Sequence, residues 1–349
     1  MAPNLVTLLG LVFNIVGLMV VFYYDPNFDQ VSPAWTYCFY GFCIFMYQTF
    51  DACDGIHARK TGQSGPLGEL FDHCCDAVNT TLSVLMFASV CGFGKGWLLF
   101  VSQFASLTNF YLSTWETYYT HTLYLSAFSG PVEGIVMIIF MCFLTGYIGQ
   151  ENLWKFPLLT VDLSDYRFGP DSYTISFLNC CIFIGGVIAF FNIYSARRNV
   201  INKLKDPEMR KDADNGLVPF FFYYATVLVM ISLHSQILHE YTTQLVISIG
   251  ATMAFTVGRI ILNHLTMQEF PRRNLPMAIP VVQLILVEIL TRFYSFAYDE
   301  VIALVVYVGL GITLAVYATF VFEIIYDITT YLDIWALSIK HPIVSKKVE

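Results

Sequence analysis

Charged residues are scarce in this sequence of 349 residues: Asp, Glu, Lys and Arg make up 13%, whereas 56% are hydrophobic and 17% aromatic. Soluble globular proteins carry about 25% charged residues. The chain therefore has about half of the ionic surface that a water-soluble protein of this size displays. This shortage excludes a soluble enzyme and favours an integral membrane protein.

Other features are missing as well. The 18 Lys and Arg are outnumbered by 26 Asp and Glu, so no basic excess is available for a nucleic acid partner. Glycine and proline form no repeats and there are no polar tracts, which excludes collagenous and disordered proteins. The nine cysteines show no paired C-x-x-C spacing, so buried thiols are favoured over a zinc site or a disulfide framework.

What the chain does contain is apolar runs of about 20 residues, the length at which a helix spans a bilayer. The expected fold class is all-α, a polytopic integral membrane protein with about ten transmembrane helices. We expect one membrane-embedded catalytic domain over 1–349, with motif helices at about 34–93 and C-terminal helices at about 216–326 for dimerisation or support. The runs lie at 3–24, 34–53, 70–93, 96–118, 131–149, 173–196, 216–235, 242–264, 275–297 and 300–326.

The distribution of basic residues predicts the orientation. Cytoplasmic loops of membrane proteins are enriched in Lys and Arg. If the N-terminus is cytoplasmic, only Lys95, Lys155, Arg167 and Arg292 lie on the other side, together with acidic loops at 25–30 and around 151–171. Both termini are therefore expected in the cytoplasm, and residues 197–215 as a polar cytoplasmic loop. The other 14 of the 18 are Arg59, Lys60, Arg197, Arg198, Lys203, Lys205, Arg210, Lys211, Arg259, Arg272, Arg273, Lys340, Lys346 and Lys347.

The most informative stretch is DACDGIHARKTGQSGPLGELFDHCCD at residues 51–76. Asp51 and Asp54 are three positions apart, and Asp72 and Asp76 are four apart, so each pair shares one face of a helix. The short Gly/Ser/Pro connection at 62–66 makes the two segments an antiparallel helical hairpin. We therefore expect the four carboxylates to converge near the cytoplasmic edge of the membrane.

Converging carboxylates require cations to neutralise them. Oxygen ligands suit hard divalent ions, so we expect two ions of Mg²⁺ or Mn²⁺, which together bind a diphosphate well. Arg59 can add a bidentate phosphate contact. The small residues Gly55, Ala58 and Gly68 would let a nucleotide diphosphate approach the backbone.

A cation-coupled transporter is the remote alternative, because transporters also use carboxylates inside the membrane. Such sites lie near the bilayer midplane on broken helices, often in repeated halves. In this sequence the carboxylates lie near one edge and no halves repeat. The pattern favours an enzyme over a transporter.

The motif D-x-x-D-G-x-x-A-R-x8-G-x-x-x-D-x-x-x-D resembles that of the CDP-alcohol phosphotransferases at every fixed position. The resemblance extends to the eukaryotic choline/ethanolamine phosphotransferases, closest to fungal members, through MAPNLVTLLG, PLGELFDHCCD, FYLSTWETYYTHTLYL, GPVEGI and YDITTYLDIWALSIKHP. Members of this family usually carry a segment before the Ala-Pro-Asn at residues 2–4. The matching positions are Asp51, Asp54, Gly55, Ala58, Arg59, Gly68, Asp72 and Asp76.

The resemblance implies transfer of phosphocholine from CDP-choline to the sn-3 hydroxyl of diacylglycerol drawn from the bilayer, with release of CMP. Ethanolamine in place of choline, or both, is the alternative. It also implies a homodimer in the membrane lipid of the endoplasmic reticulum or Golgi. Asp51, Asp54, Asp72 and Asp76 would be metal ligands, with Asp72 as the bridge.

The identity of the general base is left open. The family usually assigns this role to the last aspartate, Asp76. A metal-bound carboxylate is a weak base, whereas an unperturbed histidine titrates in the useful range, so His73 is the other candidate. Glu69 would orient it. The alternative for His73 is that it only packs or orients a carboxylate.

Further candidates flank the motif. Asn4 and Thr7 resemble the P-N-x-x-T element that the family places near the nucleotide, or Asn4 caps a helix. An aromatic cage with a carboxylate could hold the headgroup by cation–π attraction. The ordinary alternative is an interfacial aromatic belt. The headgroup candidates are Tyr111, Trp115, Glu116 and Glu133.

Overall fold

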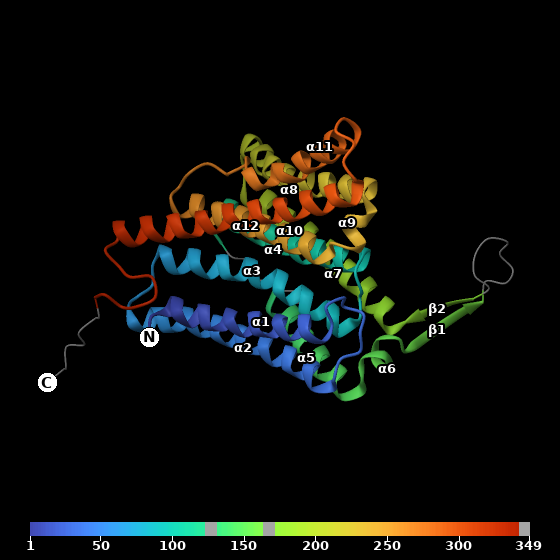
Figure 1. Cartoon of the computed structure of the whole chain (residues 1–349). Helices are drawn as coiled ribbons and strands as arrows, with labels where there is room; N and C mark the ends of the chain where they lie inside the picture. The colour runs from blue at the N-terminus through green and yellow to red at the C-terminus, as the bar shows by residue number, and fades with distance from the viewer. Residues whose placement is uncertain (123–130, 163–171, 342–349) are drawn as a thin grey trace.

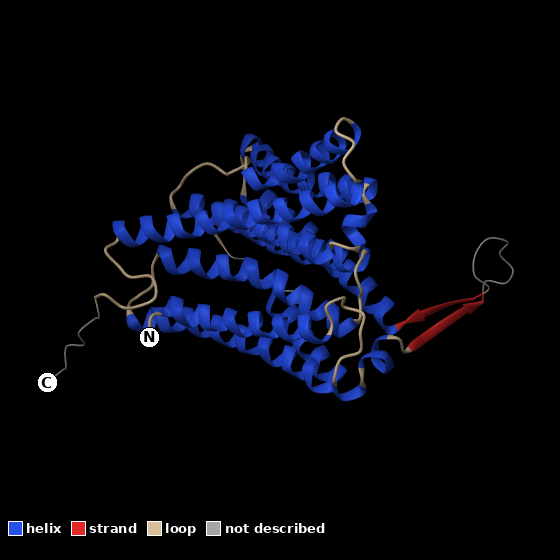
Figure 2. Cartoon of the chain, viewed as in Figure 1, coloured by secondary structure: helices blue, strands red, loops and turns tan. Residues whose placement is uncertain are grey.

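The computed structural model describes residues 1–122, 131–162 and 172–341. Arg167, Lys346 and Lys347 of the orientation argument lie outside these residues. The described chain is a bundle of long helices with the N-terminus and residues 332–341 at one end, which we call the terminal end, and a β-hairpin at the opposite, hairpin end (Figures 1 and 2). The long helices are α1 (Pro3–Tyr24), α2 (Ala34–Thr61), α3 (Pro66–Cys91), α4 (Trp97–Thr120), α5 (Pro131–Ile148), α7 (Phe177–Lys203), α8 (Pro207–Leu233), α10 (Thr242–Leu265), α11 (Ile279–Arg292) and α12 (Tyr298–Tyr331).

Each expected span corresponds to one of these helices, and the all-α membrane fold is confirmed. Within the described residues, seven helices are long and apolar enough to cross a bilayer, and α5 is a shorter apolar helix. The two others, α2 and α4, are long enough but carry more polar side chains. The count of ten spans therefore stays a prediction. Short elements complete the fold: α6 (Gln150–Trp154), α9 (Ser235–His239) and the 3-10 helix η1 (Leu275–Ala278).

The expectation for the segment after α5 was partly wrong. A loop was expected around 151–171 and a helix from 173, but β1 (Pro157–Asp162) and β2 (Ser172–Ser176) form an antiparallel hairpin, and α7 begins only at Phe177. The strands contain β-branched and aromatic residues such as Val161, Tyr173 and Ile175, which favour extended backbone. The run of apolar residues therefore contains a change from strand to helix.

The expected polar loop at 197–215 was also wrong. Helix α7 continues to Lys203 and α8 begins at Pro207, so only residues 204–206 connect them. Asp206 caps α8 by accepting the backbone N–H of Glu208 (3.0 Å), and Pro207 occupies the first helical position. The polarity of this stretch therefore marks two helix ends and not a loop.

The helices form two packed groups that meet at α3. Buried side chains of α1, α2, α3, α5 and α6, with Leu99 of α4 and Val246 of α10, make one apolar core. Those of α4, α7, α8, α9, α10, α11 and α12 make the other. Leu70 of α3 packs against Val257 and Ile261 of α10 in a smaller cluster between them. Figure 1 shows α3 between the pair α1 and α2 and helix α12. Helix α3 is thus held from both sides.

One acidic residue expected in a loop is fully buried near the hairpin end. Asp25 ends α1, and its Oδ1 accepts the backbone N–H groups of Asp29 and Gln30, both at 2.9 Å. Its Oδ2 accepts the hydroxyl of Ser89 on α3 (2.6 Å). Burial raises the pKa of the Asp25 carboxyl, and these hydrogen bonds oppose the shift. Asp25 therefore ties the α1–α2 connection to α3.

Candidate metal centre and donor cleft

A short turn places the two halves of the carboxylate motif opposite each other. Gly62 ends α2 with φ +63°, a left-handed conformation that glycine adopts without strain, and its N–H bonds back to the carbonyls of Ala58 and Arg59. Pro66 then begins α3 at its first turn. The expected short connection between two helices at 62–66 is confirmed.

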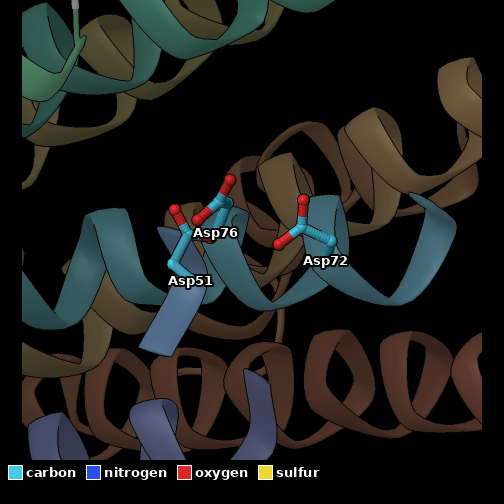
Figure 3. Close-up of side chains that lie close together, drawn as sticks. All are labelled: Asp51, Asp72 and Asp76. Atoms are coloured by element: carbon cyan, nitrogen blue, oxygen red, sulfur yellow. The ribbon is translucent and has the colours of Figure 1, made fainter. Parts of the chain in front are cut away.

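Three of the four predicted carboxylates come together. One ligand oxygen from each of Asp51, Asp72 and Asp76 lies within 4.8 Å of the others. Asp51 comes from α2, and the other two come from successive turns of α3. Figure 3 shows the carboxylates of Asp51 and Asp76 beside each other, with Asp72 further along α3. We call these three residues the carboxylate cluster.

The carboxylate cluster has the chemistry of a site for a hard divalent cation. Three anionic side chains this close repel one another unless a cation lies between them. Oδ1 of Asp72 is buried and has no hydrogen-bond partner in the part of the chain that the structure describes. Such an orphaned oxygen is costly without a ligand. Oxygen donors alone suit Mg²⁺ or Mn²⁺, so these residues fit such an ion.

Asp54, the fourth predicted ligand, lies beside the cluster and not within it. Its carboxylate accepts a short hydrogen bond from the hydroxyl of Thr7 on α1. It also lines the neighbouring cleft together with Asp72. Thr7 thus fixes Asp54 between the carboxylate cluster and α1.

Two side chains that orient the cluster were missed in the sequence. The hydroxyl of Tyr47 donates to Oδ1 of Asp76 at 2.6 Å, and Nε2 of Gln48 donates to Oδ2 of Asp51 at 3.3 Å. Tyr47 lies four residues before Asp51, one helical turn away on the same face of α2. That spacing was the signal that could have identified it.

A cleft with a volume of about 440 Å³ adjoins the carboxylate cluster at the terminal end. We call it the donor cleft. It brings together the predicted nucleotide residues from α1, α2 and the start of α3. Its walls are Pro3, Asn4, Thr7, Asp54, Gly55, Ala58, Arg59, Gln63, Ser64, Gly65, Gly68, Glu69 and Asp72.

The donor cleft offers a free cation to a phosphate. Among the described residues, Arg59 has no ion pair or hydrogen bond from its guanidinium. A Cβ at Gly55 would lie 3.3 Å from Nη1 of Arg59, so the missing side chain leaves room for the guanidinium. An unpaired guanidinium in a polar cleft is suited to bidentate phosphate binding.

His73 lies at the edge of the cluster, next to Asp72. Its Nδ1 is 3.0 Å from the backbone carbonyl oxygen of Glu69 and 3.9 Å from Oδ2 of Asp72. A carbonyl oxygen can only accept, so Nδ1 carries the proton in this contact and Nε2 keeps its lone pair. The ring is therefore held in the form in which Nε2 can accept a proton. The Glu69 carbonyl orients it.

The headgroup candidates lie apart from the donor cleft. The Tyr111 hydroxyl donates to the carbonyl of Gly216 (2.7 Å), and Nε1 of Trp115 donates to the carbonyl of Ala213 (2.9 Å), both on α8. The Glu116 carboxylate accepts Nδ2 of Asn199 on α7 (2.7 Å).

These three side chains are buried between helices, where each forms a hydrogen bond with a polar group of a neighbouring helix. Glu133 is exposed near the start of α5. None of the four belongs to the residues that line the donor cleft.

A helical membrane protein with a carboxylate cluster beside a glycine-lined cleft that contains an arginine has the groups that phosphoryl transfer needs. The family model described as CDP-alcohol phosphatidyltransferase matches residues 1–162. The chain is 45% identical to cholinephosphotransferase 1 of Saccharomyces cerevisiae over 98% of this chain and 88% of that protein.

Two further relatives are similar to this chain over nearly its full length. Choline/ethanolaminephosphotransferase 1 of the same yeast is 44% identical over 97% of this chain and 87% of that protein. Choline/ethanolaminephosphotransferase 1 of Arabidopsis thaliana is 32% identical over 97% of this chain and 87% of that protein. The chain belongs to the CDP-alcohol phosphatidyltransferase family.

Proposed function

We propose that this enzyme transfers phosphocholine from CDP-choline to the sn-3 hydroxyl of 1,2-diacylglycerol, which gives phosphatidylcholine and CMP. The observation that carries the proposal is the convergence of Asp51, Asp72 and Asp76 beside a cleft that contains the Arg59 guanidinium. The names of the yeast and plant relatives support a choline or ethanolamine donor.

In this proposal, the carboxylate cluster and Asp54 would hold two divalent ions, either Mg²⁺ or Mn²⁺. When bound, the metal neutralises the charge of the donor's diphosphate. Arg59 binds a phosphate oxygen, and Asn4, Gly55, Ala58 and Gly68 form the wall against the nucleotide. These contacts position the donor before the lipid hydroxyl arrives.

The reaction is an in-line displacement at the phosphorus that bears choline. The hydroxyl oxygen of diacylglycerol forms the new P–O bond, and the bond to the CMP phosphate breaks with its electron pair on CMP. The hydroxyl proton goes either to Nε2 of His73 or to the Asp76 carboxylate. His73 is held by the Glu69 carbonyl and Asp76 by Tyr47, so each candidate has a fixed orientation.

The proposal includes a location for the site. The excess of Lys and Arg at the terminal end supports cytoplasmic termini and a cytoplasmic active site. There a soluble donor arrives from the cytosol and the lipid acceptor arrives laterally. We infer a membrane of the endoplasmic reticulum or Golgi, and a homodimer to which the C-terminal helices contribute.

The second candidate is an ethanolamine or dual-specificity enzyme, favoured by the choline/ethanolaminephosphotransferases among the relatives. The headgroup role of Tyr111, Trp115, Glu116 and Glu133 stays a prediction. Purified protein in detergent with diacylglycerol should release CMP from CDP-choline faster than from CDP-ethanolamine. Faster release from CDP-ethanolamine would reverse the assignment. Substrate flux in sealed vesicles with no CMP from either donor would indicate a transporter.

A further inference from the structure

The chain beyond α12 turns back on itself. We call residues 332–341 the C-terminal strap. The N–H of Ile334 bonds to the carbonyl of Thr329 (3.0 Å), which ends the helix. The carboxylate of Asp333 accepts Nζ of Lys340 and Nε2 of His341. These partners hold the pKa of Asp333 below its usual value, so the carboxylate is charged at neutral pH.

The C-terminal strap contacts the wall of the donor cleft. Nδ2 of Asn4 donates to the backbone carbonyl of Ala336 at 3.0 Å, a contact between residues 332 positions apart. In Figure 1 the red segment after α12 runs across the terminal end to the N-terminus. Asn4 is buried and lines the donor cleft. The two ends of the chain therefore meet at the cleft.

This contact fixes how the Asn4 amide is turned. The Ala336 carbonyl can only accept a hydrogen bond, so it must face the amide nitrogen. The amide oxygen is then directed elsewhere. It lies 3.7 Å from where a Cβ on Gly68 would be, in the first turn of α3 on the cleft wall. Asn4 thus presents an acceptor oxygen to the donor cleft.

We propose that the C-terminal strap is a positioning element of the donor cleft: its Ala336 carbonyl locks Asn4 with the amide oxygen toward the bound nucleotide. That oxygen accepts a hydrogen bond from an N–H or O–H group of the nucleotide. If the strap is loosened, the Asn4 amide is free to rotate. Ordering the amide when the donor binds then lowers the affinity for the donor. This inference rests on the proposed function for the identity of the donor.

The kinetic test uses full-length protein in detergent and initial rates of CMP release from CDP-choline. Asp333→Ala should raise KM for CDP-choline about fivefold, with kcat and the KM for diacylglycerol within about twofold of wild type. Asp333→Glu should restore KM. In an Asn4→Ala background, Asp333→Ala should add nothing, because both changes remove the same interaction. Asp214→Asn, which breaks the exposed ion pair with Arg197, is the matched control.

An unchanged KM for Asp333→Ala, or effects of the two variants that multiply, would overturn the inference. A second measurement needs no turnover: trypsin cleavage after Lys340, followed by mass spectrometry. CMP with Mg²⁺ should slow this cleavage in the wild type and not in Asn4→Ala. Equal cleavage with and without CMP rejects the strap's role, whereas absence of CMP release from any donor rejects the proposed function alone.

Discussion

The hydroxyl of Tyr47 on α2 donates to Oδ1 of Asp76 on α3 at 2.6 Å, so each half of the carboxylate motif is tied to the other by a hydrogen bond. Tyr47 is 1% exposed, and its ring packs with Leu11 and Cys75 in a small apolar cluster. The packing fixes the orientation of the Tyr47 ring, and the hydrogen bond from its hydroxyl fixes the orientation of the Asp76 carboxylate. The direction of Asp76 is therefore determined by a residue outside the recognised motif.

Replacing Tyr47 by Phe should lower kcat about tenfold, because a hydrogen bond to a charged group contributes roughly 1.5–3 kcal/mol and Asp76 would turn away from its oriented position. Initial rates of CMP release measure this. Tyr40→Phe is the control, since Tyr40 is equally buried two turns earlier on α2. Equal rates for both variants and wild type would show that Tyr47 only packs.

Removal of divalent metal should stop the reaction. We expect EDTA to reduce CMP release to background and Mg²⁺ or Mn²⁺ to restore it, because three carboxylates within 4.8 Å need a cation. Asp72→Asn removes an anionic ligand and should lower kcat about a thousandfold or raise the Mg²⁺ concentration for half-maximal rate tenfold or more. Asp214→Asn should leave both quantities unchanged. Full activity in EDTA would contradict a metal centre.

The sequence predicted the convergence of Asp51, Asp72 and Asp76 because the signals for it are local. Helix geometry alone puts Asp72 and Asp76 on one face, and the glycine and proline at 62–66 predict the turn that brings Asp51 opposite. Helix spacing could also have shown that Tyr47 lies on the same face of α2 as Asp51. Its hydrogen bond to Asp76, 29 positions away, is seen only in the packed helices.

Contacts between distant segments left no such signal. The bond from Ser89 to Asp25 joins residues 64 positions apart, and that from Asn4 to Ala336 joins residues 332 apart. The sequence predicts an acidic loop at 25–30, and polar residues in loops normally face solvent. The Asp25 carboxylate is buried because it replaces water as the partner of two backbone N–H groups and a hydroxyl. The hydrophobic periodicity of the sequence does not reveal that a buried carboxylate takes the place of water in this way.

The role of His73 can be separated from metal binding. If Nε2 takes the hydroxyl proton, His73→Gln should lower kcat by about 10²–10⁴-fold and leave the Mg²⁺ dependence as in wild type. His239→Gln, an exposed histidine at the hairpin end, is the control. Near-wild-type turnover would exclude His73 and leave Asp76 as the base. A shifted Mg²⁺ dependence would instead show that His73 orients Asp72.

The buried Asp25 makes stability depend on pH in a direction that can be tested. Burial raises the pKa of this carboxyl in the folded protein above its usual value of 3.8, so the folded state binds the proton more tightly than the unfolded state. The stabilisation is present at low pH and is lost as the pH rises through the raised pKa. For this group, stability therefore falls as the pH rises above the usual carboxyl pKa.

Asp25→Asn should remove that dependence, because an amide cannot titrate and its oxygen can still accept the N–H groups of Asp29 and Gln30. Melting temperatures in detergent, measured upward from pH near the usual carboxyl pKa of 3.8, should show a smaller decline in Asp25→Asn than in wild type. Asp299→Asn, which changes an exposed aspartate in the first turn of α12, should follow the wild-type profile. Parallel profiles for Asp25→Asn and wild type would contradict the burial effect. Asp25→Ala should cost about 2 kcal/mol, because it leaves buried donors unpaired.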